Sequence, residues 1–155
     1  MFREMRLKDQ QLDAAEANEI MNRCTNGVLS INGDNGYPYG VPVSYAYADG
    51  RIYFHCAREG YKVDLLKNDP HVSFTVVARD DIIPEDFNTL YISAIAFGRA
   101  RLVDDPEEMR KIHGYIIDKY SKGHEESGGR YLDSSISEIY MVEITVDHIT
   151  AKAGC

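Results

Sequence analysis

The fold is constrained most by a two-residue alternation that runs from Gly27 to Ala57. Apolar side chains recur there at every second position, which is typical of strands with one buried face. Two turn signals interrupt the alternation, the cluster Asn32–Gly36 and the pair Asp49-Gly50, and Asp-Gly is a strong hairpin signal. The pattern predicts an antiparallel meander. One face of its strands should carry Val41, Val43, Tyr45 and Tyr47, and then Ile52, Phe54 and Cys56.

The rest of the chain divides into periodic segments and polar connections. Gly98 lies within a long apolar segment and predicts a bulge or a close approach of another strand. Asp105-Pro106-Glu107-Glu108 has the cap, proline and acidic residues of a helix start. The polar segments 79–88 and 121–129 predict loops. Helices are expected over 9–23, over 61–67 and from the start at 105–108 to 120, and further strands over 71–78, 89–103 and 139–151.

Six strands with three helices between them favour a mainly β fold of the α+β class, a small closed antiparallel barrel. The length of 155 residues suits a single domain, 1–155. The balance of 17 basic against 25 acidic residues gives a net charge of −8, which argues against general nucleic-acid binding. No signal peptide is visible and no apolar run is long enough for a membrane span, so we expect a cytoplasmic protein without a membrane partner.

The segment from His55 to Lys62 is the densest group of chemically useful residues. A strand is expected to end near Ala57, and a helix should open close to Tyr61 after the permissive Gly60. A helix N-terminus with Arg58 and Lys62 beside it suits a phosphate. The alternative interpretation is that both cations are solvated surface residues.

Other side chains give weaker signals. His55 suits a cofactor or substrate contact, a general acid or a core histidine, and Cys56 is expected to be buried and inert. The three cysteines are widely spaced, and neighbouring strand residues point to opposite faces, so neither a disulfide framework nor a metal site is indicated. No nucleophile elbow, P-loop or dinucleotide motif is present. An enzyme with this sequence would need a cofactor for its chemistry.

Three motifs stand out along the chain: GYPYGVPVSY at 36–45, IYFHCA at 52–57 and GYKVD at 60–64. They resemble the nitroimidazole-resistance (Nim) proteins, members of the pyridoxamine 5′-phosphate oxidase-like split barrels. The segments NDPHVSF at 68–74, AFGRA at 96–100 and HITAK at 148–152 are also similar. The similarity runs in order along nearly the whole chain.

The resemblance implies a six-stranded antiparallel split β-barrel that forms a homodimer, with FMN, or less often FAD, at the subunit interface. The strand around Val41–Tyr45 would lie along the flavin ring through its backbone, and Lys62 would reach the phosphate. Phe97 and Arg99 would come from the partner subunit. The full set of implied cofactor-binding residues is Val41, Pro42, Val43, Ser44, Tyr45, His55, Cys56, Ala57, Arg58, Lys62, Phe97 and Arg99.

The chain departs from pyridoxamine 5′-phosphate oxidase itself at residues 151–155. That enzyme ends in an Arg-Leu-x-Pro segment that holds its substrate, whereas this sequence reads AKAGC there. We therefore expect an FMN-dependent reductase of small aromatic or nitro compounds, with His55 as a polar contact or proton donor. The alternatives are a non-catalytic flavin or haem binding protein or redox sensor of the same fold, and a structural dimer with a degenerate site.

Overall fold

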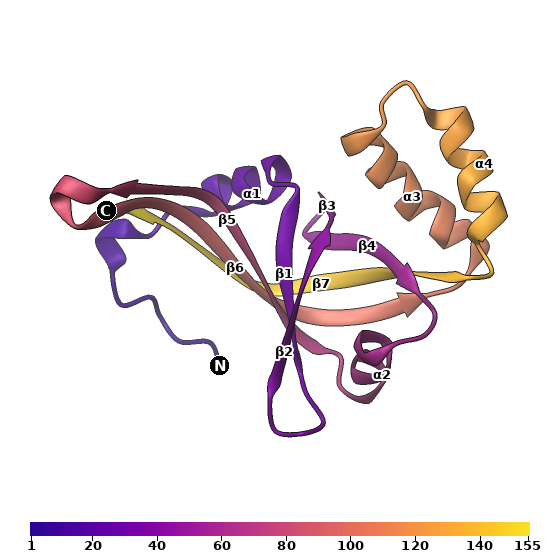
Figure 1. The fold of residues 1–155 in the computed structure, drawn as a ribbon, viewed down its shortest axis with the longest axis horizontal. Coiled ribbons are helices and arrows are strands. Elements are labelled where there is room, and N and C mark those ends of the chain that lie inside the picture. Colours follow the sequence, from indigo (N-terminus) through magenta and orange to yellow (C-terminus); the bar gives the residue numbers. More distant parts are fainter.

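An antiparallel sheet of seven strands forms the centre of the computed structural model, which describes residues 1–155 (Figure 1). The strands are β1 (Asn26–Asn32), β2 (Pro38–Ser44), β3 (Ala46–Ala48), β4 (Arg51–Ala57), β5 (His71–Ile83), β6 (Asn88–Val103) and β7 (Ile139–Gly154). The helices are α1 (Ala14–Arg23), α2 (Tyr61–Asn68), α3 (Pro106–Tyr120) and α4 (Glu125–Ser135), with short 3₁₀ turns at Lys8–Gln10 and Pro84–Asp86. None of the helices combines the length and apolarity needed to cross a bilayer.

The strand order is β2-β1-β5-β6-β7-β4-β3, so β2 and β3 lie at opposite edges of the sheet. The alternation from Val41 to Tyr47 predicted one strand, but the chain leaves β2 after Ser44 and enters β3 at Ala46. Tyr45, fully buried between them, carries the chain from one edge to the other. This division explains why there are seven strands rather than six. The predicted split barrel is confirmed, whereas the expectation of a closed one is wrong because β2 and β3 pair with β1 and β4, not with each other.

Two hydrophobic cores lie on opposite faces of β4 and β7. The larger one includes Ile52, Phe54 and Cys56 from β4 and is covered by α1 and α2. The smaller one contains Tyr53 together with Leu132 of α4 and side chains of α3. The alternation predicted in β4 is therefore confirmed, and both of its faces are used. Figure 1 shows α3 and α4 as a helical hairpin at one end of the sheet, far from the tip of the β5–β6 hairpin.

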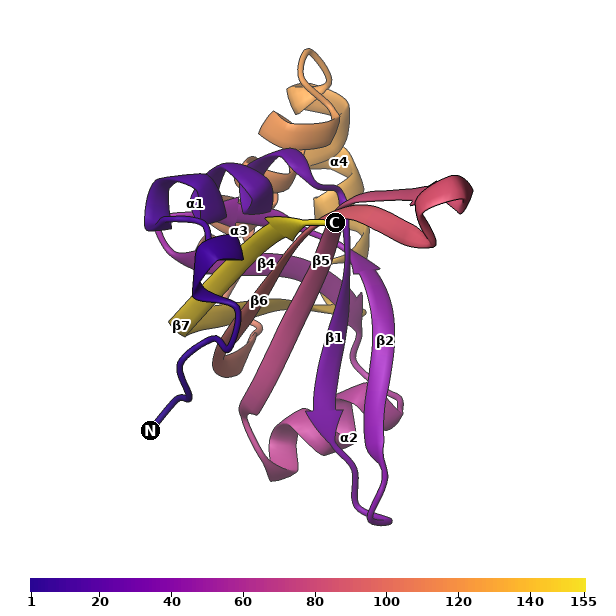
Figure 2. The ribbon, with the colours of Figure 1, turned by 90° about the vertical axis from the view of Figure 1, so that its left-hand side faces the viewer.

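Two segments predicted as loops are ordered elements. Residues 79–88 continue β5 and begin β6 as a projecting hairpin arm (Figure 2), which starts beyond a bulge between Val77 and Arg79. Its strands are mostly exposed, so they lack the apolar alternation that marks a strand. Within 121–129, α4 begins at Glu125. Leu132 and the contact of Gly128 with Ile117 hold this helix against α3.

Gly98 confirms its predicted role as a point of close approach. The register of β6 against β7 shifts between Phe97 and Gly98. A Cβ atom at Gly98 would lie 2.3 Å from the carbonyl oxygen of Thr145, which no real side chain allows. The long β6–β7 pair therefore bends at this glycine.

Candidate functional site

Strand β4 presents the IYFHCA motif with alternate side chains on its two faces. Phe54 and Cys56 point into the larger core, and Cys56 is only 8% exposed. Burial raises the pKa of the Cys56 thiol, which keeps it protonated and unreactive, as expected. His55 points to the other face and is exposed. Any contact of Cys56 with a cofactor would therefore involve its backbone.

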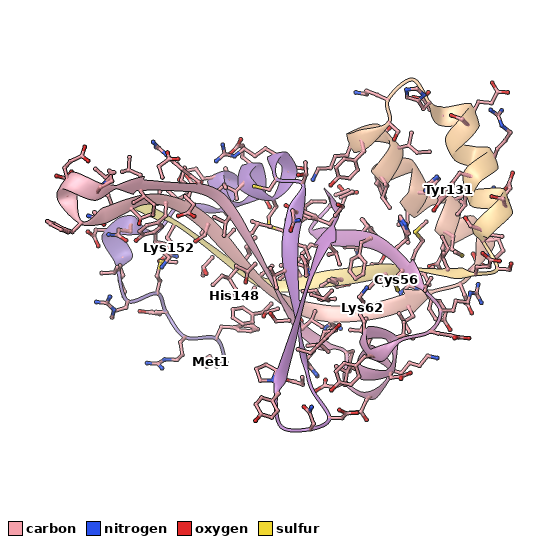
Figure 3. The ribbon with its side chains drawn as sticks, viewed as in Figure 1. Met1, Cys56, Lys62, Tyr131, His148 and Lys152 are labelled. Atoms are coloured by element: carbon pink, nitrogen blue, oxygen red, sulfur yellow. The ribbon has the colours of Figure 1, made fainter.

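The turn from β4 to α2 leaves a helix start open. Gly60 precedes the helix at φ 127°, a conformation that side-chain-bearing residues rarely adopt, and no side chain caps the first turn. The free N–H groups of that turn carry the positive end of the helix dipole. The Lys62 ammonium lies 5.8 Å from the centre of the Phe54 ring, so the cation lies beside the end of β4 (Figure 3).

Strand β2 reaches the same helix start. The Tyr61 hydroxyl donates a hydrogen bond of 2.6 Å to Asp34, in the turn before β2, and that bond raises the pKa of Tyr61. The Tyr61 ring also meets Tyr39 of β2 edge-on, with 5.0 Å between ring centres. The two segments that the sequence assigned to one site, β2 and the β4–α2 turn, are thus neighbours.

The residues of β2 divide between the core and an open surface. Val41 and Val43 pack against the larger core, whereas Pro42 and Ser44 are exposed. Because β2 is an edge strand, the backbone groups that face away from β1 have no strand partner. Such an edge can meet a planar ligand through its backbone, the kind of contact that the resemblance implied.

Tyr45, by contrast, has its side chain inside the protein. Its hydroxyl donates to the carbonyl oxygen of Met21 at 2.7 Å, and its ring meets Phe74 edge-on. Burial raises the pKa of Tyr45 far above its ordinary value. The phenol is therefore a structural group that ties α1 to the sheet.

Arg58 has internal partners, although the sequence suggested a phosphate ligand or a solvated cation. Its Nε and Nη2 atoms donate to the carbonyl oxygens of Ile139 and Ile136 at 3.0 and 3.1 Å. The guanidinium also lies 5.0 Å from the centre of the Tyr140 ring. Arg58 thus fixes the end of β4 to the connection between α4 and β7. Lys62 is the cation of this turn that stays available.

Phe97 and Arg99 lie further along the sheet, on β6. Arg99 forms a bidentate pair with Asp147, with N–O distances of 3.0 and 2.9 Å, which lowers the pKa of Asp147. Phe97 is exposed and approaches Phe2, whose ring stacks on His148. These rings border a cavity of about 420 Å³ between the N-terminal segment and strands β6 and β7, where Figure 3 places Met1, His148 and Lys152.

The helical hairpin α3–α4 adds residues that the sequence did not connect with His55. A cavity of about 360 Å³ lies between β4 and this hairpin, and its wall includes His55, His113, His124 and Tyr131. Loss of hydration lowers the pKa of His55, and the nearby His113 and Lys62 lower it further. His113 falls within the third expected helix and position 124 within the expected loop 121–129, so no sequence pattern linked them to β4.

Together, the open start of α2, Lys62 and the free edge of β2 form a surface that fits an anionic group joined to a planar one. The first turn of α2 supplies N–H donors for a phosphate, and Lys62 supplies a positive charge. The Lys62 side chain is only partly buried, so a ligand can reach it. No serine or cysteine nucleophile lies next to a base here, since Cys56 is in the core. The arrangement can bind and orient a ligand, and redox chemistry would have to come from that ligand.

Comparison with known proteins agrees with this geometry. Residues 13–153 match the family described as pyridoxamine 5′-phosphate oxidase. No match is found among curated proteins. Several solved structures have the same fold at low sequence identity.

One such structure is a candidate 5-nitroimidazole antibiotic resistance protein from Bacteroides thetaiotaomicron, with 23% identity, 92% of this chain and 86% of that chain covered, and a TM-score of 0.81. A FAD-binding protein from Mesorhizobium loti has 20% identity and a TM-score of 0.67, with 94% of this chain and 98% of that chain covered. A flavocytochrome from Azotobacter vinelandii has 16% identity and a TM-score of 0.77, with 99% of this chain and 73% of that chain covered. These structures share the fold, and because the family match spans most of the sequence, the chain belongs to the pyridoxamine 5′-phosphate oxidase family.

Proposed function

We propose that this protein is a flavin-dependent oxidoreductase, an FMN-bound reductase of small aromatic or nitro compounds. The observation that carries the proposal is the uncapped start of α2, with Lys62 beside it and the free edge of β2 adjacent. The family membership supports it, as do similar folds described as FAD-binding and as a flavocytochrome. FAD is the second possible form of the cofactor.

Each part of this surface has a role in the proposed site. The Lys62 ammonium and the first N–H groups of α2 would hold the flavin phosphate. The backbone of β2 from Val41 to Ser44, and that of β4 near Ala57, would lie along the ring. In a homodimer with the flavin at the subunit interface, Phe97 and Arg99 of one subunit would complete the site of the other.

The bound flavin would supply the electron transfer to the substrate. The chain's own contribution is to bind and orient. His55 is exposed on β4 and keeps an imidazole near the end of the strand, where it can give a hydrogen bond to a substrate. Arg58 holds the end of β4 in place through Ile136 and Ile139.

The test is the absorption spectrum of the purified protein, followed by titration of the flavin-free protein with FMN and with FAD. We expect a flavin spectrum or tight uptake of FMN. The loaded protein is then supplied with a reduced nicotinamide and a nitroaromatic acceptor, and acceptor-dependent oxidation supports the reductase. A protein that takes up neither flavin contradicts the proposal, and flavin binding without turnover would leave a flavin carrier or redox sensor instead.

A further inference from the structure

The cavity of about 420 Å³ between the N-terminal segment and strands β6 and β7 is built by one chain. Residues 1–5 supply one wall, and side chains of β6 and β7 supply the other (Figure 3). Two backbone contacts fix the chain that follows residues 1–5 against β7. The Leu12 N–H donates to the carbonyl oxygen of Ala151 at 2.9 Å, and Gln11 forms a β-bridge with Lys152. The volume falls in the range of pockets that hold a small molecule.

Three aromatic rings meet at the wall of this cavity. The Phe2 ring stacks on the His148 imidazole, with 4.6 Å between ring centres and 5° between the planes. The Phe97 ring lies 5.2 Å from the Phe2 ring, and Ile95 lies two positions before Phe97 on the same face of β6. Ring contacts are favourable at these distances, so the wall suits a flat aromatic ligand.

The lysine and the arginine of the cavity wall have no acidic counterpart. Arg3 and Lys152 belong to the wall, and no aspartate or glutamate does. Neither cation pairs with a carboxylate. The acid next to Arg3 in the sequence, Glu4, is paired with Lys8 at 2.6 Å. In a chain with a net charge of −8, two unpaired cations at one cavity make a local site for an anion.

The donors of this cavity favour a carboxylate over a phosphate ester. The start of α2 offers a phosphate a group of backbone N–H donors, but no helix begins at this cavity. A carboxylate carries a single charge, and the guanidinium of an arginine matches its two oxygens. The cations of the wall therefore suit a singly charged, flat acid.

We propose that this cavity binds a small aromatic carboxylate, with its ring against Phe2 and Phe97 and its carboxylate beside Arg3 and Lys152. Binding involves residues of one chain and does not depend on the flavin. Phe97 is also expected at the partner's flavin, so the same ligand would be a substrate held next to that flavin. That last step alone rests on the proposed function.

Two probes of similar size that differ in charge test the proposal: 4-nitrobenzoate, an anion, and 4-nitrobenzamide, which is neutral. Affinities are measured by calorimetry at low and at higher salt on the protein as purified, with and without added FMN. We expect 4-nitrobenzoate to bind about tenfold more tightly at low salt, because its carboxylate meets two cations. The preference should shrink as salt screens the charges, and added FMN should leave it unchanged.

Variants separate the charge from the ring. Lys152→Met removes the charge and keeps an unbranched side chain in β7, and Arg3→Gln lies before the first helical turn, at Lys8–Gln10, so it leaves the sheet intact. We expect each variant to lower the preference for 4-nitrobenzoate to about threefold, and the double variant to abolish it. Phe2→Leu should weaken the binding of both probes alike, because it removes a ring and no charge.

Lys111→Met is the matched control, because Lys111 is exposed on α3 and has no ion pair. The preference for 4-nitrobenzoate should stay unchanged in this variant. Thermal melts check that each variant folds, and if Lys152→Met does not fold, Arg3→Gln decides alone.

Equal affinity of the two probes for the natural protein would overturn the proposal, as would the absence of binding of either. A preference that survives in the double variant, or that falls equally in Lys111→Met, would place the carboxylate elsewhere and also overturn it. Loss of 4-nitrobenzoate binding when FMN saturates the protein would assign the cavity to the flavin instead. A protein that takes up no flavin can still show the preference, so the two proposals fail independently.

Discussion

Helices α1 and α2 begin in opposite ways. At the start of α1, the Asp13 carboxylate accepts from the N–H of Glu16 at 2.8 Å, and the Glu16 carboxylate accepts from the N–H of Asp13 at 3.0 Å. This capping box satisfies the end of the helix from within the chain. Helix α2 begins after Gly60 with no side-chain cap and with Lys62 in its first turn. The open end can serve a ligand because the chain itself does not occupy it.

The far end of α2, like the start of α1, is held by side-chain hydrogen bonds. Asp69, just after the helix, accepts from the Asn32 amide at 2.9 Å and from the His71 N–H at 3.0 Å. Val63, Leu65 and Leu66 bury the inner side of the helix in the larger core. Anchoring at one end and along one side thus positions the open end. This contrast separates residues that support the fold from residues available for binding.

The largest expected effect comes from Lys62→Ala. Loss of a charge-assisted contact with a phosphate should weaken FMN binding by about 10- to 100-fold, with the melting temperature nearly unchanged. Fluorescence titration measures the affinity. Lys67→Ala is the matched control, because Lys67 lies in the last turn of the same helix. Equal losses in both variants would show that the effect is not specific to the open end.

For the capped helix α1 we expect the reverse pattern, a loss of stability without a loss of FMN affinity. Asp13→Ala removes the acceptor for Glu16 and should lower the stability by about 1 kcal/mol, because a lost N-cap leaves a helix N–H unsatisfied. In a domain of this size that corresponds to a melting temperature lower by about 2–4 °C. FMN affinity should not change. A weaker affinity in this variant would mean that the two helix starts are not independent.

How far the sequence predicted these differences depends on the range of the interactions. The alternation in β4 and the glycine at 98 are local signals, and both were interpreted correctly. The partners of Arg58 are the carbonyl groups of Ile136 and Ile139, about 80 positions away, so its internal role could not be predicted from the turn alone. The crossing at Tyr45 was missed because the alternation continues through it. Gly128 and Gly129 hid α4 because glycine disfavours helices.

The anchored end of α2 should show a pH dependence in strong acid. Hydrogen bonds from Asn32 and His71 lower the pKa of Asp69 from 3.8 to about 2. A lowered pKa means that the stabilisation is complete above the unfolded value and is lost as the pH falls from about 4 toward 2. Asp69→Asn should therefore show a shallower loss of stability over this range in acid denaturation. Identical acid profiles for the variant and the natural protein would contradict this role.

The smallest effect links the open end of α2 to His55. The Lys62 ammonium is one of the causes that lower the pKa of His55, after loss of hydration and the effect of His113. Removing this positive charge makes the protonated imidazole less unfavourable, so Lys62→Ala should raise the pKa of His55 toward its ordinary value. Titration of the His55 ring by NMR measures the change, and Lys67→Ala should leave it unaltered. An unchanged titration midpoint of the His55 ring in Lys62→Ala would contradict this link. It would mean that His55 and the proposed phosphate-binding end of α2 are electrostatically separate.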